Sequence, residues 1–259
     1  MGHLRLGTLP QSKRWREVVG LLESDASLLD IAEAAALASE SDLKRAANDP
    51  LFQYVASLLV RLPFAARAPG FPDGLEELGI AGDRDGSVSA LLSGIDEAIE
   101  RRAFETGRAS DAGELARTAL LESLSENLRA RLPTLFEPTQ QEIRKALAGF
   151  ASGDRFAGLA RDFFARLSYR SLDWYLSREL ANHTGPGRRF DTDADRSAFQ
   201  SALAQHTYEA SRIVEAFAGG WYGKTVWREQ SLTEDSINGF TRFAFKKLRS
   251  ELGRRRELA

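Results

Sequence analysis

Residues 88–99 read VSALLSGIDEAI, and their apolar side chains recur at intervals of three and four residues. This spacing places Val88, Leu91, Leu92, Ile95 and Ile99 on one side of a helix, where they are buried together. Four further stripes show the same period: Trp15, Val18, Val19 and Leu22; Leu121, Leu124, Leu128 and Leu132; Phe199, Leu203, Ala210, Ile213 and Phe217; and Ile237, Phe240, Ala244, Leu248 and Leu252. No stretch shows the strict alternation that indicates a strand. The sequence therefore predicts an all-α protein.

Helix boundaries and loops divide this pattern. Asp49 and Pro50 form a capping carboxylate followed by proline at a first helical position. Capping boxes begin at Thr139 and at Ser231. Residues 63–86 hold three of the eight prolines and five of the 21 glycines, which predicts a connection between two parts. We expect one large bundle-like domain of about 8–10 helices, with an N-terminal helical layer (1–62), the connection (63–86) and a main helical domain (87–259).

Composition limits the chemistry of the chain. It has no cysteine, which excludes disulfides, thiolate metal sites and a thiol nucleophile. The net charge of −2 gives no overall attraction to nucleic acid or to an anionic membrane. No signal core is found, nor an uninterrupted apolar run of about 18 residues. We expect a cytoplasmic protein without a membrane contact. The 29 arginines against six lysines, with abundant alanine, are typical of a GC-rich bacterial genome.

The clearest enzymatic signal is the run from Arg178 to His183. It resembles the R-x4-6-H signature of HEPN domains, which are all-helical and often act as metal-independent ribonucleases; the resemblance covers these six residues. It implies that Arg178 stabilises a developing phosphorane and that His183 exchanges protons near neutral pH. The family commonly presents the two residues together at a dimer cleft. The alternative is that His183 continues the stripe of Leu172, Leu176 and Leu180 as a half-buried residue at a helix end.

Residues 218–225, AGGWYGKT, match a relaxed phosphate-loop pattern. A phosphate loop follows a strand, whereas a helix precedes this segment, so we do not expect nucleotide binding. We interpret Gly219 and Gly220 as a helix stop before an aromatic turn. Trp221, Tyr222 and Trp227 then either pack onto the core or, if exposed, form a partner-binding site.

Two groups have partial metal-site patterns. His206 and Glu209 lie three residues apart, but a buried histidine bonded to a carboxylate explains them more simply. Asp191, Asp193 and Asp195 begin like a calcium loop, which lacks its glycine and its final glutamate. These aspartates fit the start of the next helix better. We expect neither a metal nor a cofactor.

The C-terminal segment is basic. Six basic residues and one acidic residue give residues 246–256 a net charge of +5, which leaves −7 for the rest of the chain. The basic residues are Lys246, Lys247, Arg249, Arg254, Arg255 and Arg256. They form either a solvated helix face or a contact for nucleic acid or an acidic partner.

These patterns lead to three hypotheses. The first is a non-enzymatic helical subunit or adaptor that binds a protein partner or a second copy within a bacterial multiprotein assembly. The second is a HEPN-like ribonuclease that uses Arg178 and His183. The third is a nucleic-acid-binding helical module that uses the basic C-terminal helix.

Overall fold

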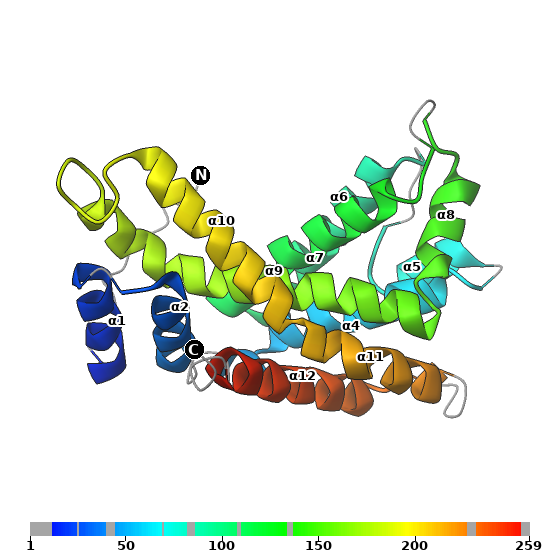
Figure 1. Cartoon of the computed structure of the whole chain (residues 1–259). Coiled ribbons are helices and arrows are strands. Elements are labelled where there is room, and N and C mark those ends of the chain that lie inside the picture. Colours follow the sequence, from blue (N-terminus) through cyan, green and yellow to red (C-terminus); the bar gives the residue numbers. More distant parts are fainter. Residues whose placement is uncertain are drawn as a thin grey trace.

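Helix α9 (Gly153–Leu180) is the longest element, and α7, α10 and α11 all pack against it. The computed structural model describes residues 12–24, 26–39, 45–68, 70–81, 86–107, 110–133, 137–226 and 232–254. The 28 residues of α9 span roughly 42 Å at 1.5 Å per residue. Its buried side chains, including Phe156, Phe163 and Leu172, face several neighbours at once. This helix is therefore the central support of the fold (Figure 1).

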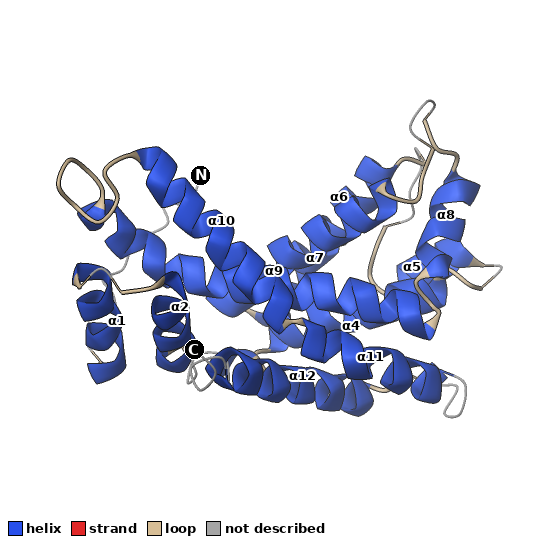
Figure 2. Ribbon diagram, viewed as in Figure 1, coloured by secondary structure: helices blue, strands red, loops and turns tan. Residues whose placement is uncertain are grey.

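The remaining helices surround α9 (Figures 1 and 2). They are α1 (Lys13–Glu23), α2 (Leu28–Ala38), α4 (Pro50–Ala65), α5 (Phe71–Glu77), α6 (Val88–Thr106), α7 (Asp111–Arg129), α8 (Gln140–Gly149), α10 (Asp193–Ala210), α11 (Arg212–Lys224) and α12 (Glu234–Arg254), with a 3₁₀ turn at Ala181–His183. α12 lies beside α11 and also packs on α2 and α4, whereas α1 packs on α2. In the described part of the chain, strand pairing is limited to one isolated bridge between Thr184 and Phe190. The all-α prediction is confirmed.

Side-chain caps fix where many of these helices begin. The Asp49 carboxylate accepts the backbone N–H of Phe52 at 2.8 Å, so α4 starts where the sequence predicts. The predicted capping box at Thr139 and Glu142 is present at the start of α8. Thr192 forms another at the start of α10. The capping box expected at Ser231 lies outside the described residues.

The buried side chains form one continuous hydrophobic core from α1 to α12. Its aromatic part lies between α9, α11 and α12, where Phe156 stacks on Tyr222 with ring centroids 4.0 Å apart. Phe164 of α9 meets Phe240 and Phe245 of α12 edge-on. Aromatic side chains carry large apolar areas, so this cluster joins three helices strongly.

The segment 63–86, whose composition predicts a connection, contains the end of α4 and the whole of α5. Pro63 lies inside α4, two residues before its end. Because proline has no N–H to donate to the carbonyl four residues earlier, it weakens the last turn and favours the end of the helix there. Phe71 and Leu75 are buried side chains of the short helix α5, which packs on α4. The division of the chain at this segment stays a prediction.

The alanine-rich sequence from Ser27 to Ala47 predicts one helix, but α2 ends at Ala38 and Ser39 is its C-cap. None of the described helices is long and apolar enough to cross a membrane.

Candidate functional site

Helices α11 and α12 leave a partly exposed apolar row between them, which we call the α11–α12 seam. It consists of Ile213, Phe217 and Trp221 of α11 and Phe243 of α12. The α11 members are four residues apart, so they lie on one face, and all three are half-buried. Phe243 is 44% exposed and meets Phe217 edge-on at 4.7 Å. Trp221 stacks on the buried Phe240 at 4.2 Å, which holds its ring in place.

Exposed lysines border this seam. The Lys247 ammonium lies 5.4 Å from the centre of the Phe243 ring, within cation–π range, and Lys246 is exposed beside it. Residues 236–250 hold four basic residues and no acidic one. The seam is therefore apolar along its centre and positive along its α12 side.

The α11 side carries small residues. Ala216 and Gly220 are exposed next to Phe217 and Trp221. A Cβ added at Gly220 meets no atom within 4 Å, so this side is open. Small side chains allow the backbone of another element to approach closely.

The three residues predicted to bind a partner have different environments. Trp221 belongs to the seam. Tyr222 is completely buried, and its hydroxyl donates to the Val60 carbonyl at 3.4 Å. Its side chain is a core residue, so we exclude it from the partner-binding prediction. Trp227 lies outside the described residues.

Burial has a measurable consequence for Tyr222. It raises the pKa of the phenol well above the ordinary value. In the unfolded chain a tyrosine ionises near pH 10. Above pH 10 the unfolded chain loses this proton while the folded chain keeps it. The contribution of Tyr222 to the free energy of unfolding is therefore complete below about pH 10 and is lost as the pH rises further.

We therefore expect alkaline pH to lower the free energy of unfolding more for the wild type than for Tyr222→Phe. The difference between them should shift by up to about 1.4 kcal/mol per pH unit above pH 10. Urea unfolding at pH 8 and near pH 11 measures this difference. Tyr208→Phe is the control, because Tyr208 is 39% exposed. Parallel profiles for the wild type and Tyr222→Phe would contradict the burial argument.

The predicted helix stop at Gly219 and Gly220 is wrong. Both residues lie inside α11, which continues to Lys224. Gly219 faces the start of α9, where a Cβ added to it would lie 3.0 Å from the Gly153 carbonyl oxygen. Glycine is required here because the two helices approach each other closely. The segment forms no phosphate loop, because it is part of the helix α11.

The basic C-terminal residues are only partly described. Lys246 and Lys247 are exposed, Arg249 is half-buried, and Leu248 and Leu252 between them are buried. The side chain of Arg254 and the whole of Arg255 and Arg256 lie outside the described residues. α12 therefore serves both as part of the core and as a positive surface.

Arg178 and His183 lie at the end of α9. The Arg178 guanidinium is 4.6 Å from the centre of the Trp174 ring and 5.8 Å from that of Tyr175. His183 belongs to the 3₁₀ turn, and its carbonyl accepts the N–H of Phe190 at 3.0 Å. These contacts stabilise the end of α9. The hypothesis that Arg178 and His183 together cleave RNA stays a prediction. Unchanged RNA cleavage by His183→Ala would exclude it.

The partial metal patterns have local structural roles. His206 is buried in α10. Glu209 pairs with Arg212 at 3.0 Å. Asp195 completes the cap of Thr192. Among the described residues, no group of three or more histidine, aspartate or glutamate side chains is placed to hold a metal ion.

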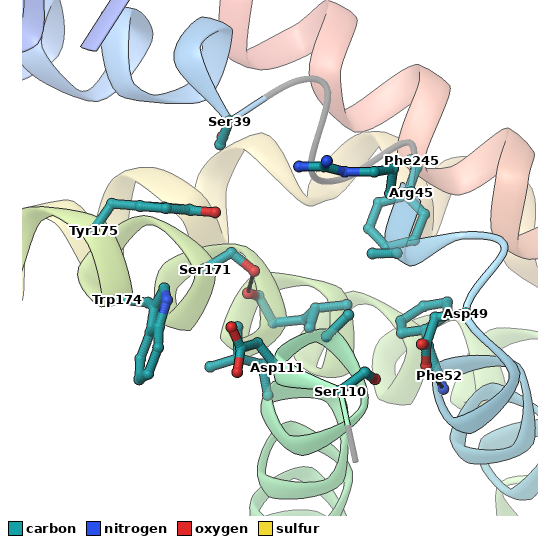
Figure 3. A pocket seen from close by; sticks show the side chains of 14 residues that line it. Ser39, Arg45, Asp49, Phe52, Ser110, Asp111, Ser171, Trp174, Tyr175 and Phe245 are labelled. Atoms are coloured by element: carbon teal, nitrogen blue, oxygen red, sulfur yellow. Dashed lines mark hydrogen bonds between the residues drawn. The ribbon is translucent and has the colours of Figure 1, made fainter. Parts of the chain in front are cut away.

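A cavity of about 260 Å³ lies among the first turns of α4 and α7 and the sides of α9 and α12. We call it the α4–α7 cavity. Figure 3 shows Tyr175, Ser171 and Asp111 on one side and Phe52 and Phe245 on the other. It is the second candidate site, after the seam.

Sequence reasoning placed Phe217 in a buried stripe, and it did not assign Phe243, which lies outside the stripe of Ile237, Phe240 and Ala244. The period of a stripe shows which side chains share one face of a helix, but it does not show how much of that face a neighbouring helix buries. Sequence reasoning also missed the α4–α7 cavity, whose lining comes from Ser39 after α2, residues 45–46, the start of α4, the start of α7, and the sides of α9 and α12.

The chain matches no protein-family model, and comparisons with curated proteins and with solved structures gave no match.

Proposed function

We propose that this protein is a non-enzymatic helical adaptor that binds an acidic amphipathic helix of a protein partner through the α11–α12 seam. The observation that carries the proposal is the half-exposed row of Phe217, Trp221 and Phe243 beside exposed lysines. Aromatic side chains dominate binding energy at protein interfaces, and apolar patches on a surface mark contact sites.

The chemistry of the seam specifies the partner. Its apolar centre fits one stripe of leucine-like or aromatic side chains, and the small residues Ala216 and Gly220 leave room for a helix backbone. Lys246 and Lys247 complement carboxylates beside that stripe, which favours an acidic helix over a basic one. A second copy of this chain would bring the same lysines together, so it fits less well.

Capture from an extract of the source organism, with and without nuclease treatment, tests this. We expect the tagged wild type to retain a protein in about equimolar amount, and Phe243→Ala to retain at least tenfold less, about 1.4 kcal/mol. The double variant Lys246→Glu/Lys247→Glu should lose it as well. Lys145→Glu, on an exposed lysine of α8, is the matched control and should retain it.

Two results contradict the adaptor. One is equal capture by the wild type and Phe243→Ala when circular dichroism shows both folded. The other is an eluate that holds only nucleic acid and is empty after nuclease.

The charge of α12 favours nucleic-acid binding as the second candidate. Residues 236–250 carry four basic residues without a carboxylate, and such contacts weaken steeply with salt. Truncation before Lys246 would remove the buried Leu248 and Leu252, so Lys246→Gln/Lys247→Gln is the suitable variant. An affinity for RNA or DNA that does not change with salt excludes this candidate.

A further inference from the structure

Another cavity, of about 410 Å³, lies at the last turns of α8, and we call it the α8 cavity. Residues 131–133, which follow α7, form one wall, and Arg155 in the first turn of α9 forms a second. One face of α8 forms the third wall. The volume lies within the roughly 300–1,000 Å³ of small-molecule sites. Three elements therefore enclose a space that a small organic molecule would fill.

Two guanidinium groups are held at this cavity by adjacent residues at the end of α8. The Arg131 guanidinium carbon lies 4.7 Å from the centre of the buried Phe150 ring, in a cation–π contact. A Cβ added at Gly149 would lie 3.0 Å from Nη1 of Arg155, so this guanidinium rests against the glycine. Because Gly149 and Phe150 are neighbours in the chain, the two positive groups lie close together.

These two charges have no compensating carboxylate. Neither Arg131 nor Arg155 forms an ion pair with an acidic residue in the described part of the chain. Glu142 also lines the cavity, but its carboxylate accepts the N–H and the hydroxyl of Thr139 at 2.8 Å each. These bonds and the nearby Lys145 charge lower the pKa of Glu142. With Lys145 and Glu142 offsetting each other, the two arginines give the described lining a net charge of +2.

The positions of the two arginines are unfavourable without an anion. Partial desolvation and the nearby charge of Arg155 lower the pKa of the Arg131 guanidinium. Arg155 also lies in the first turn of α9, where the helix dipole disfavours a cation. Asp154 of the same turn is exposed and does not belong to the described lining. An anion in the cavity would attract both guanidinium groups and the start of α9.

The cavity also specifies the kind of anion. A phosphate monoester carries about −1.5 to −2 charges near neutral pH, which matches the charge of the lining, and its three terminal oxygens accept from planar guanidinium forks. Leu132 and Ala146 are half-buried and give the cavity an apolar side. The organic group of an ester would cover this side, whereas a free inorganic ion would leave it in water.

We propose that the α8 cavity binds a small organic phosphate monoester. Its phosphate lies between the guanidinium groups of Arg131 and Arg155, and its organic group lies against Leu132 and Ala146. The described lining belongs to residues 131–155, so it includes no residue of α11 or α12. The site is therefore separate from the α11–α12 seam and stands or falls independently of the adaptor proposal.

Calorimetric titration of the full chain with three probes at one salt concentration tests the proposal. The probes are phenyl phosphate, its diester methyl phenyl phosphate, which has a single negative charge, and inorganic phosphate, which lacks the ring. We expect phenyl phosphate to bind about tenfold or more tightly than the diester, because the diester leaves one positive charge uncompensated. It should bind about fivefold more tightly than inorganic phosphate, because only the ester covers the apolar side.

Two variants assign the phosphate contact. Arg131→Gln and Arg155→Gln should each weaken the binding of phenyl phosphate by about tenfold or more, because each removes one guanidinium fork. Both arginines are exposed, so circular dichroism should show both variants folded. Arg129→Gln is the matched control, because Arg129 is an exposed arginine at the end of α7 that lies outside the described lining. It removes the same charge and should leave the affinity unchanged.

Four results overturn the proposal. The first is the absence of binding at millimolar phenyl phosphate. The second is equal or tighter binding of the diester, which would indicate the backbone of a nucleic acid instead. The third is equal affinity for phenyl phosphate and inorganic phosphate, which would mean an adventitious ion only. The fourth is that Arg131→Gln and Arg155→Gln bind phenyl phosphate as well as Arg129→Gln does.

Discussion

Replacing Phe156 by alanine is expected to lower the free energy of unfolding by about 3–5 kcal/mol, the range for phenylalanine in a packed core. Its side chain is fully buried at the centre of the aromatic cluster. The ring stacks on Tyr222 at 4.0 Å and lies 5.9 Å from Phe240 and 6.1 Å from Trp221. Removing it leaves a cavity where α9, α11 and α12 meet, since neighbouring helices collapse only partly into such a space.

Urea unfolding measures this loss, and Phe104→Ala provides the comparison. Phe104 is 88% exposed on α6, so its removal should change the free energy of unfolding by less than about 0.5 kcal/mol. Similar values for the two variants would mean that the aromatic cluster does not hold the three helices together. Because Phe240 also supports Trp221, Phe156→Ala should weaken partner capture along with stability.

The fold was predictable where its signals are local. The stripe of Leu91, Ile95 and Ile99 is buried in α6 as its period predicts, and the caps at Asp49 and Thr139 start α4 and α8. A cap involves residues within one turn, and a stripe involves one face, so both are visible in the sequence.

Neighbouring residues of α11 show why the candidate site was harder to predict. Trp221 and Tyr222 are adjacent and both aromatic, yet one belongs to the surface seam and the other to the core. Their positions follow from the phase of the helix, about 100° per residue. A predicted helix stop at Gly219 and Gly220 gave no phase for the residues after it. The reason for glycine at position 219 is its close approach to Gly153, which lies on another helix.

The α4–α7 cavity was beyond sequence reasoning for a related cause. Arg45, Asp111 and Tyr175 show no pattern in common along the chain. They share a space because α4 and α7 pack together and α7 packs on α9. Such a site depends on the packing of whole helices, which periodicity alone does not give.

Replacing Gly153 by alanine is expected to separate α9 from α11 and lower the free energy of unfolding by about 1–3 kcal/mol, the usual cost of overpacking. A Cβ at this position would lie 2.9 Å from the Gly219 carbonyl oxygen, which is closer than a carbon atom and an oxygen atom can pack. The obstacle is backbone, so no side chain can rotate away. The contact is mutual, since a Cβ at Gly219 meets the Gly153 carbonyl oxygen at 3.0 Å.

Gly158→Ala distinguishes this contact from the general effect of glycine in a helix. Gly158 lies in the same helix with no atom within 4 Å of an added Cβ, so alanine should raise the free energy of unfolding by about 0.5–1 kcal/mol. Opposite signs for the two variants in urea unfolding identify the α9–α11 approach as the reason for Gly153. If both variants were stabilised, the helices would have room between them, and Gly219 would need another explanation within α11.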